Sequence, residues 1–475
     1  MRGNCFQAVP WVIVGLGCAA FAVSAGVDAT TIKNPTEAEL SSLGRAIFFN
    51  KELSNPPGMS CASCHAPETG YTFPNSAANL WRGTAGGAVA GRFGDRKVPT
   101  VAYAPFFAEG PPHYDKDAIA FVGGLFWDGR ANTAQQQAHF PLLNVNEMNG
   151  RGKEADPYQS LAQHLAGSSL APQFLATFGE QIFKQSPKFV VEQMSRALVA
   201  YEKSPEVSPF TSKYDAYLEG KAKFTPQELL GMRLATGTID GRPDGLPFRK
   251  SAHCADCHGL SNNLSTGKDI WTNSCFANLG VPRNPLNRYY TMTDRERNPL
   301  GFNSLGKRYV DLGMGPIFYG LMPDAPVFLG GMDLLGIYGT FKAPTLRNVD
   351  KRPSPGFVKA YMHNGVFKSL KEVVHFYNSR NLTTQPGEVI DFTRPNPYAG
   401  LKGKPLFAPP EYLDPWTMVN PTGVAGGVGT GGAVNNAPVL DPDAMQVGNL
   451  GLTDSQEDAI VAFLKTLTDG YFERK

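Results

Sequence analysis

Two short runs of the chain, residues 61–65 (CASCH) and 254–258 (CADCH), place two cysteines and a histidine at the same spacing. Two thiols three positions apart can each bond one vinyl group of the same haem, and the adjacent histidine can then ligate its iron. A zinc site would need both cysteine pairs in one tetrahedral set and would leave the histidines without a role. We therefore predict two covalently bound haem c groups. Their attachment residues are Cys61, Cys64 and His65 in the first run and Cys254, Cys257 and His258 in the second, with the histidines as proximal iron ligands.

The same order of features surrounds each run. A capping box opens an amphipathic helix before it, and a Pro-Thr-aliphatic run and a tripeptide ending in glycine follow it. The matched features are the boxes 36–39 and 225–228, the Pro-Thr runs 99–101 and 344–346, and the tripeptides 127–129 (WDG) and 363–365 (HNG). Strand signals are weak and short. The repeat therefore predicts a mainly α protein with two homologous cytochrome c-like haem domains and long loops.

The boundary between these domains is expected just after a helix that ends near Glu202, where Pro205, Pro209 and Gly220 follow. We therefore predict an N-terminal domain over residues 33–205 and a C-terminal domain over residues 206–475. Within the second domain, residues 420–444 are rich in glycine, proline, valine and asparagine, which predicts a flexible surface insertion. A capped final helix is expected after Thr453.

Residues 1–25 are typical of a cleaved export signal. Arg2 precedes an almost unbroken apolar stretch over residues 8–23, and Val23-Ser24-Ala25 fits a small-residue cleavage site. A membrane anchor is the alternative, but the stretch is short for a bilayer and contains Pro10. No later segment is apolar enough to span a membrane. We therefore expect a periplasmic protein without a membrane span after cleavage.

The charge balance bears on the binding partners, and the cysteines outside the haem runs bear on the core. The 44 basic and 42 acidic residues give a net charge of +2 without a basic block, so nucleic acid is not an expected partner. Of the seven cysteines, Cys5 and Cys18 would leave with the signal. Cys275, outside the haem runs, is expected to be a small buried hydrophobe.

With these features in place, the chain resembles the bacterial dihaem cytochrome c peroxidases and their MauG-type relatives. The similarity extends from about Pro35 to the final helix, in specific order and spacing. The matching stretches are residues 43–66, 126–148, 341–349 and 361–377. The departures are insertions at about 107–122, 290–338 and 381–447.

The resemblance implies unequal roles for the two haems. The haem on His65 would react with hydrogen peroxide, and the haem on His258 would exchange electrons with an outside donor. Glu147 matches the distal carboxylate that moves the peroxide proton. Gln137 matches the amide of the same distal pocket, and Trp127 matches the indole between the haems that relays an electron.

The resemblance also leads to expectations about the ligands of the two irons and about a calcium ion. The glycine-rich loop 83–95 lacks the histidine that blocks the first haem in peroxidases needing activation, so a five-coordinate haem is expected at His65. Tyr377 matches the sixth ligand of the second haem, with His375 and Met362 as alternatives. Lys97 stands where the family places an asparagine ligand of calcium. An ammonium group cannot ligate a cation, so calcium is possible but doubtful.

The resemblance therefore implies a periplasmic dihaem oxidoreductase that reacts with hydrogen peroxide and takes electrons from a small cytochrome c or a copper protein. One alternative is a MauG-like enzyme, which oxidises side chains of a protein substrate through Trp127. Another is a dihaem electron-transfer cytochrome without chemistry of its own.

Overall fold

The computed structural model of the chain describes residues 32–116, 120–151, 156–237, 251–259, 266–292, 303, 305–317, 337–380, 411, 448 and 450–471. The export signal predicted at 1–25 and the insertion predicted at 420–444 lie outside these ranges. Within these ranges, no helix is both long enough and apolar enough to cross a membrane.

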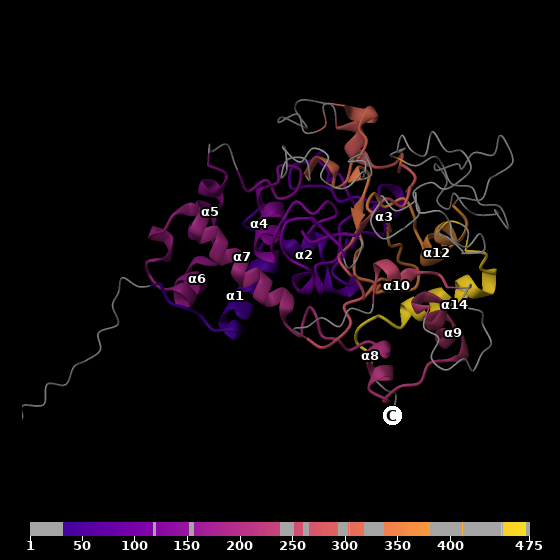
Figure 1. The fold of residues 1–475 in the computed structure, drawn as a ribbon. Coiled ribbons are helices and arrows are strands. Elements are labelled where there is room, and N and C mark those ends of the chain that lie inside the picture. Colours follow the sequence, from indigo (N-terminus) through magenta and orange to yellow (C-terminus); the bar gives the residue numbers. More distant parts are fainter. Residues whose placement is uncertain are drawn as a thin grey trace, which may run out of the picture.

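The described chain is mainly helical, as predicted (Figure 1). The α-helices are α1 (Glu37–Phe49), α2 (Cys61–Cys64), α3 (Ser76–Trp81), α4 (Ala134–Leu143), α5 (Pro157–Gly167), α6 (Ala171–Phe178), α7 (Pro187–Lys203), α8 (Lys213–Leu218), α9 (Pro226–Thr236), α10 (Cys254–Cys257), α12 (Leu370–Ser379) and α14 (Asp454–Lys465). The 3₁₀ turns are η1 (Pro67–Thr69), η2 (Ala104–Phe106), η3 (Ile182–Lys184), η4 (Arg288–Thr291) and η5 (Gly306–Arg308). The strands form two antiparallel pairs, β1 (His113–Asp115) with β2 (Ala120–Val122) and β3 (Phe276–Ala277) with β4 (Phe341–Lys342).

The N-terminal core forms where α1 crosses α7. The predicted capping box is present, with Thr36 accepting from the backbone N–H of Glu39 and the Glu39 carboxylate accepting from the N–H of Thr36. The helices approach at Gly44, where a Cβ atom would lie 1.9 Å from the backbone oxygen of Ala197. Glycine is therefore required for this crossing, which brings the buried faces of both helices together.

The C-terminal core repeats this arrangement with α9 and α14. Both predicted capping boxes are present, at 225–228 and 453–456. At the crossing, a Cβ on Gly231 would lie 1.9 Å from the backbone oxygen of Ala459. The same close helix pair, with glycine at the contact, therefore closes each half of the molecule.

The backbone around the two tripeptides also repeats. The residue before each tripeptide and its glycine both have positive φ: 67° at Phe126 and 76° at Gly129, then 65° at Met362 and 71° at Gly365. An antiparallel bridge encloses each, pairing 125 with 131 and 361 with 367. The next helix, α4 or α12, has its N-cap six residues after the first tripeptide residue. Trp127 and His363 therefore occupy equivalent places in the two halves.

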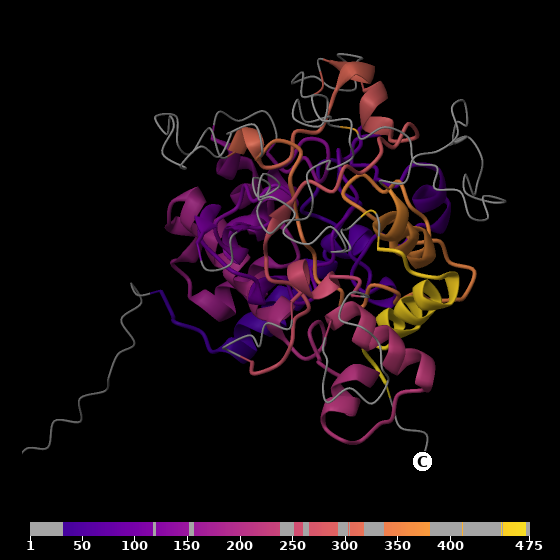
Figure 2. The ribbon, with the colours of Figure 1, turned by 45° about the vertical axis from the view of Figure 1, so that its right-hand side comes forward.

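The two halves contact each other through a reciprocal pair of hydrogen bonds. The backbone N–H of Lys97 donates to the oxygen of His363 at 2.7 Å, and that of Lys342 donates to the oxygen of Trp127 at 2.8 Å. Each lysine stands two residues before the proline of its Pro-Thr run. The halves lie side by side in both ribbon views, with α1, α5, α6 and α7 on one side and α9, α12 and α14 on the other (Figures 1 and 2). The interface therefore has approximate two-fold symmetry.

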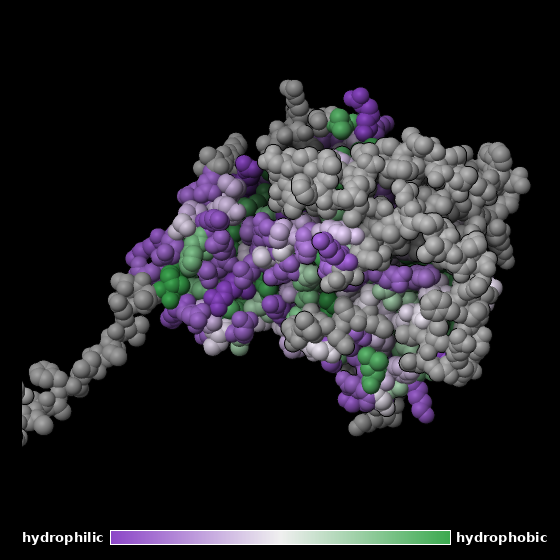
Figure 3. All heavy atoms as spheres, in the orientation of Figure 1, coloured by the Kyte–Doolittle hydropathy of each residue, from purple (hydrophilic) through white to green (hydrophobic). Residues whose placement is uncertain are grey.

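Buried ion pairs reinforce this interface. Arg96 binds Asp128 of the first half and Asp311 of the second, each at 2.6 Å. Val122 of β2 also forms a bridge with Cys275, which is buried, as expected for a small hydrophobe. In the face drawn in Figure 3, the described surface is mostly hydrophilic with scattered hydrophobic side chains.

Candidate functional site

The first cysteine–histidine run lies at the wall of a cavity in the N-terminal half. α2 is one helical turn, so Cys61 and Cys64 line the cavity together with His65. The Nδ1 atom of His65 lies 3.1 Å from the backbone oxygen of Tyr71, which leaves Nε2 for a metal. Burial lowers the pKa of His65 to about 4, so its imidazole is neutral and has a lone pair to give.

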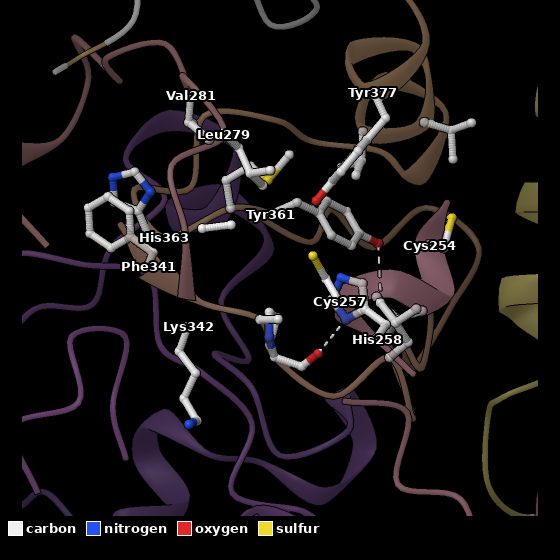
Figure 4. A pocket seen from close by; sticks show the side chains of 18 of the residues that line it. Cys254, Cys257, His258, Leu279, Val281, Phe341, Lys342, Tyr361, His363 and Tyr377 are labelled. Atoms are coloured by element: carbon white, nitrogen blue, oxygen red, sulfur yellow. Dashed lines mark hydrogen bonds between the residues drawn. The ribbon is translucent and has the colours of Figure 1, made fainter. Parts of the chain in front are cut away.

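The second run has the same geometry in the C-terminal half (Figure 4). Cys254, Cys257 and His258 line one cavity, and Nδ1 of His258 lies 2.8 Å from the backbone oxygen of Pro344. Burial lowers the pKa of His258 to about 4 as well. The proline of the Pro-Thr run therefore holds the histidine in the orientation that a proximal iron ligand needs.

These cavities fit haem c rather than zinc. The two cysteine pairs lie in separate cavities, so they do not form one tetrahedral set. Among the residues that the structure describes, no group of three or more His, Cys, Asp or Glu side chains could hold a metal ion. A haem iron needs only one histidine from each run, and the mostly apolar walls suit its flat macrocycle.

The three predicted catalytic residues, Glu147, Gln137 and Trp127, all line the cavity that holds His65. Gln137 comes from α4, and Glu147 lies in the turn after α4, where its backbone N–H donates to the oxygen of Asn144. Burial raises the pKa of Glu147 to about 7, and Asp95 adds to this effect. A carboxyl group with this pKa can both accept and return a proton near neutral pH.

The internal repeat shows which residue of the His65 cavity corresponds to Tyr377, the expected sixth iron ligand of the second haem. Tyr377 lies fourteen residues after His363, and the residue at the same distance from Trp127 is Pro141. Pro141 lines the His65 cavity, as Tyr377 lines the His258 cavity, but its side chain has no atom that can bind iron. His65 is the one histidine in the described lining of its cavity. The five-coordinate haem expected at His65 stays a prediction.

The structure separates the three candidates for the sixth ligand of the second haem. Tyr377 and Met362 both line the cavity, whereas His375 lies outside its lining and places Nδ1 2.9 Å from the carboxylate of Glu457. Figure 4 shows the Tyr377 side chain reaching from α12 into the cavity that His258 lines. Burial raises the pKa of the Tyr377 phenol, so without iron it is neutral. The geometry therefore favours Tyr377 or Met362.

Trp127 connects the two cavities. It is the one residue common to both linings among the residues described, and it is 8% exposed. Its indole N–H donates to the backbone oxygen of Lys97 at 2.9 Å, while its own backbone oxygen accepts from Lys342. The ring is therefore fixed between the places where the two haems would bind.

One residue of the His65 cavity was missed from the sequence. Glu202 of α7 is 4% exposed, and its Oε2 atom has no hydrogen-bond partner in the described structure. Burial raises its pKa to about 8, and its charge acts on the nearby Cys61. Glu202 lies four residues after Leu198, on the apolar stripe of the helix. A carboxyl group on the apolar face of an amphipathic helix is the sequence feature that could have identified it.

The residues near Lys97 do not fit a calcium ion. Lys97 lines the His65 cavity, and its ammonium group cannot ligate a cation. The carboxylates of Asp128 and Asp311 are bound to Arg96, so they are not free to ligate a cation.

Comparison with known proteins places this geometry in a family. A family model for di-haem cytochrome c peroxidases matches residues 38–223. The chain is 30% identical to the methylamine utilization protein MauG of Paracoccus denitrificans, over 92% of this chain and 91% of that protein. The chain belongs to the di-haem cytochrome c peroxidase family.

Two further relatives are consistent with this family membership. The chain is 28% identical to the cytochrome c peroxidase Ccp of Escherichia coli, over 70% of this chain and 60% of that one. The dihaem peroxidase BthA of Burkholderia thailandensis superposes with a TM-score of 0.63 at 28% identity, covering 94% of this chain and 89% of BthA. The membership confirms the predicted family and the mainly α fold with two haem domains. It also identifies the protein as a dihaem peroxidase-type oxidoreductase with haem cofactors.

Proposed function

We propose that the protein is a periplasmic dihaem c-type peroxidase that reacts with hydrogen peroxide in the cavity of His65, with electrons arriving through the haem on His258 and Trp127. The observation that carries the proposal is the difference between the distal walls. The first cavity has a buried carboxyl group, Glu147, and has Pro141 where the second has Tyr377. In this proposal, peroxide enters the first cavity and meets a proton-transferring group.

In this proposal Glu147 does the acid–base work. It takes the proton from one oxygen of hydrogen peroxide and returns it to the other, so that the departing oxygen leaves as water. Gln137 orients the peroxide from the same wall by hydrogen bonding. A haem bound at His65 would supply the electrons that break the O–O bond. Overall, one hydrogen peroxide, two protons and two electrons give two waters.

Trp127 is proposed as the route between the haems. Its ring lines both cavities and is held by Lys97, so its position does not depend on side-chain motion. The electrons would come from a small cytochrome c or a copper protein at the second haem. The attachment of both haems through thioether bonds, the cleavage after Ala25 and the domain boundary at 205/206 belong to this proposal.

A MauG-like reaction is the second candidate, because Tyr377 reaches into the second cavity and a relative is named as a methylamine utilization protein. A phenolate is a hard anionic ligand, which favours higher oxidation states of iron over easy uptake of an electron. Steady-state turnover with a reduced small cytochrome c separates the candidates. Fast turnover supports the peroxidase, and slow turnover with stored oxidising equivalents supports oxidation of a protein substrate.

Electron paramagnetic resonance of the ferric holoprotein tests the proposal as a whole. One high-spin and one low-spin haem, with the high-spin signal lost on adding peroxide, is the expected result. Two low-spin haems that do not respond to peroxide would contradict it and would leave an electron-transfer role for the isolated protein.

A further inference from the structure

The approximate two-fold symmetry of the interface places two lysines at equivalent positions. Lys97 and Lys342 each donate a backbone hydrogen bond to the tripeptide of the opposite half. Both lie next to Trp127, the first through the indole N–H and the second through its backbone oxygen. One lysine therefore lines each haem cavity, Lys97 that of His65 and Lys342 that of His258.

The two ammonium groups differ in their partners. Nζ of Lys342 donates to the backbone oxygens of Gly123 and Ser274, both at 3.1 Å. In Figure 4 its side chain points away from His258 and Tyr377. For Lys97, in contrast, no described residue accepts a hydrogen bond from Nζ, and its side chain lines the His65 cavity. Only one of the two symmetric lysines is therefore satisfied by the protein.

A second cation lies close to Lys97. Nζ of Lys359 donates to three backbone oxygens, at 2.8 Å from Thr69, 2.9 Å from Lys351 and 3.3 Å from Asn348. Burial lowers the pKa of Lys359, and repulsion from Lys97 lowers it further. Burial alone lowers the pKa of Lys97 to about 8, because no neighbouring carboxylate opposes it. Lys97 and Lys359 therefore repel each other, and Asp350 offsets part of this repulsion at Lys359 but not at Lys97.

Lys97 is partly exposed within the cavity, and a haem bound there would cover it. A buried cation without a partner is unfavourable, so this position is expected to bind an anion. Each haem carries two propionate carboxylates, and these are the anions that a haem in this cavity would bring. We propose that Lys97 is a fixed cation between the haems that pairs with a haem propionate and occupies the place of a divalent metal ion. This inference rests on the proposed binding of haem at His65.

The charge can be tested with two variants of the holoprotein. Lys97→Met removes the charge and keeps the length, and Lys97→Arg keeps the charge and is the matched control. Loss of a nearby positive charge stabilises ferric over ferrous haem. For Lys97→Met we expect the ferric-to-ferrous ratio at a fixed potential to rise at least tenfold, which is about 59 mV for a one-electron couple. For Lys97→Arg, the potential should match the wild type.

Spectroelectrochemistry gives the potentials, and a pyridine haemochrome assay gives the haem content. Two haems per chain with an unchanged potential in Lys97→Met would overturn the inference. A preparation without haem would instead contradict the proposed function, so the two failures are distinguishable.

Metal analysis of the wild type tests independently whether Lys97 occupies the place of a divalent metal ion. This test remains available even if Lys97→Met does not fold. After purification in calcium-containing buffer, we expect no stoichiometric calcium, and we expect EGTA to leave the melting temperature and haem spectra unchanged. One calcium per chain, removed by EGTA with a spectral change, would overturn the inference.

Discussion

The two cavities have the same arrangement on the side of the proximal histidine and differ on the opposite, distal side. In each, two cysteines precede a histidine whose Nδ1 is held by a backbone oxygen. On the distal side, Pro141 corresponds to Tyr377, and Gln137 corresponds to Val373, ten residues after Trp127 and His363 respectively. The comparison shows how a duplicated haem scaffold can acquire two functions: the attachment is kept, while a few distal side chains decide between reaction with peroxide and electron transfer.

The largest expected effect comes from removing the distal carboxyl group. Glu147→Gln keeps the size of the side chain but cannot accept the peroxide proton, and general acid–base catalysis contributes typically about 10²–10⁴-fold. We expect the rate of reaction with hydrogen peroxide to fall by this factor, as measured by stopped-flow absorbance. The exposed Glu180→Gln is the matched control and should keep the wild-type rate.

The same residue predicts a pH dependence. Only the ionised carboxylate can take the proton, so in the wild type the rate should rise as pH increases through about 7 and then level off. The profile of Glu147→Gln should be flat over this range. An unchanged profile in the variant would assign the titration to another group, such as Glu202.

The next effect tests the structural equivalence of the two halves. Gly44→Ala and Gly231→Ala each place a Cβ 1.9 Å from a backbone oxygen of the partner helix, so the crossing must open. We expect each to lower the free energy of unfolding by about 1–3 kcal/mol or more, measured by denaturant titration. Gly167→Ala in α5, where a Cβ would meet nothing within 4 Å, is the control and should not destabilise. A large loss in one half and none in the other would contradict the equivalence.

A smaller effect is expected at the second haem. If Tyr377 is the sixth ligand, Tyr377→Phe removes an anionic donor that favours ferric iron, so the reduction potential should rise. A tenfold change in the ratio of oxidation states, about 59 mV, is the expected scale. Met362→Leu is the matched variant, and it should leave the potential and the visible spectrum unchanged. The opposite pattern would assign the ligand to Met362.

The sequence predicted the parts of this comparison that depend on local pattern. The capping boxes at 36–39, 225–228 and 453–456 and the mainly α fold follow from spacing and composition, and the structure confirms them. The haem runs also follow from spacing, and the structure places each of them at the wall of a cavity. Glu202 was missed because an acidic residue in an amphipathic helix is usually solvated. Gly44 and Gly231 were missed because close approach of two helices is a tertiary property. The reciprocal bonds of Lys97 and Lys342 also needed coordinates, since they join residues far apart in the chain.

The smallest expected effect on stability belongs to Trp127, although its effect on electron flow should be clear. Trp127→Phe keeps an aromatic ring but loses the hydrogen bond to Lys97, which costs about 1 kcal/mol. Phenylalanine is harder to oxidise than tryptophan, so peroxide added at the first haem should oxidise the second haem more slowly, with two haems still bound. Rapid-mixing absorbance at the two haems measures this. The exposed Trp81→Phe is the matched control. Equal rates in both variants would mean that electrons cross between the cavities without the indole.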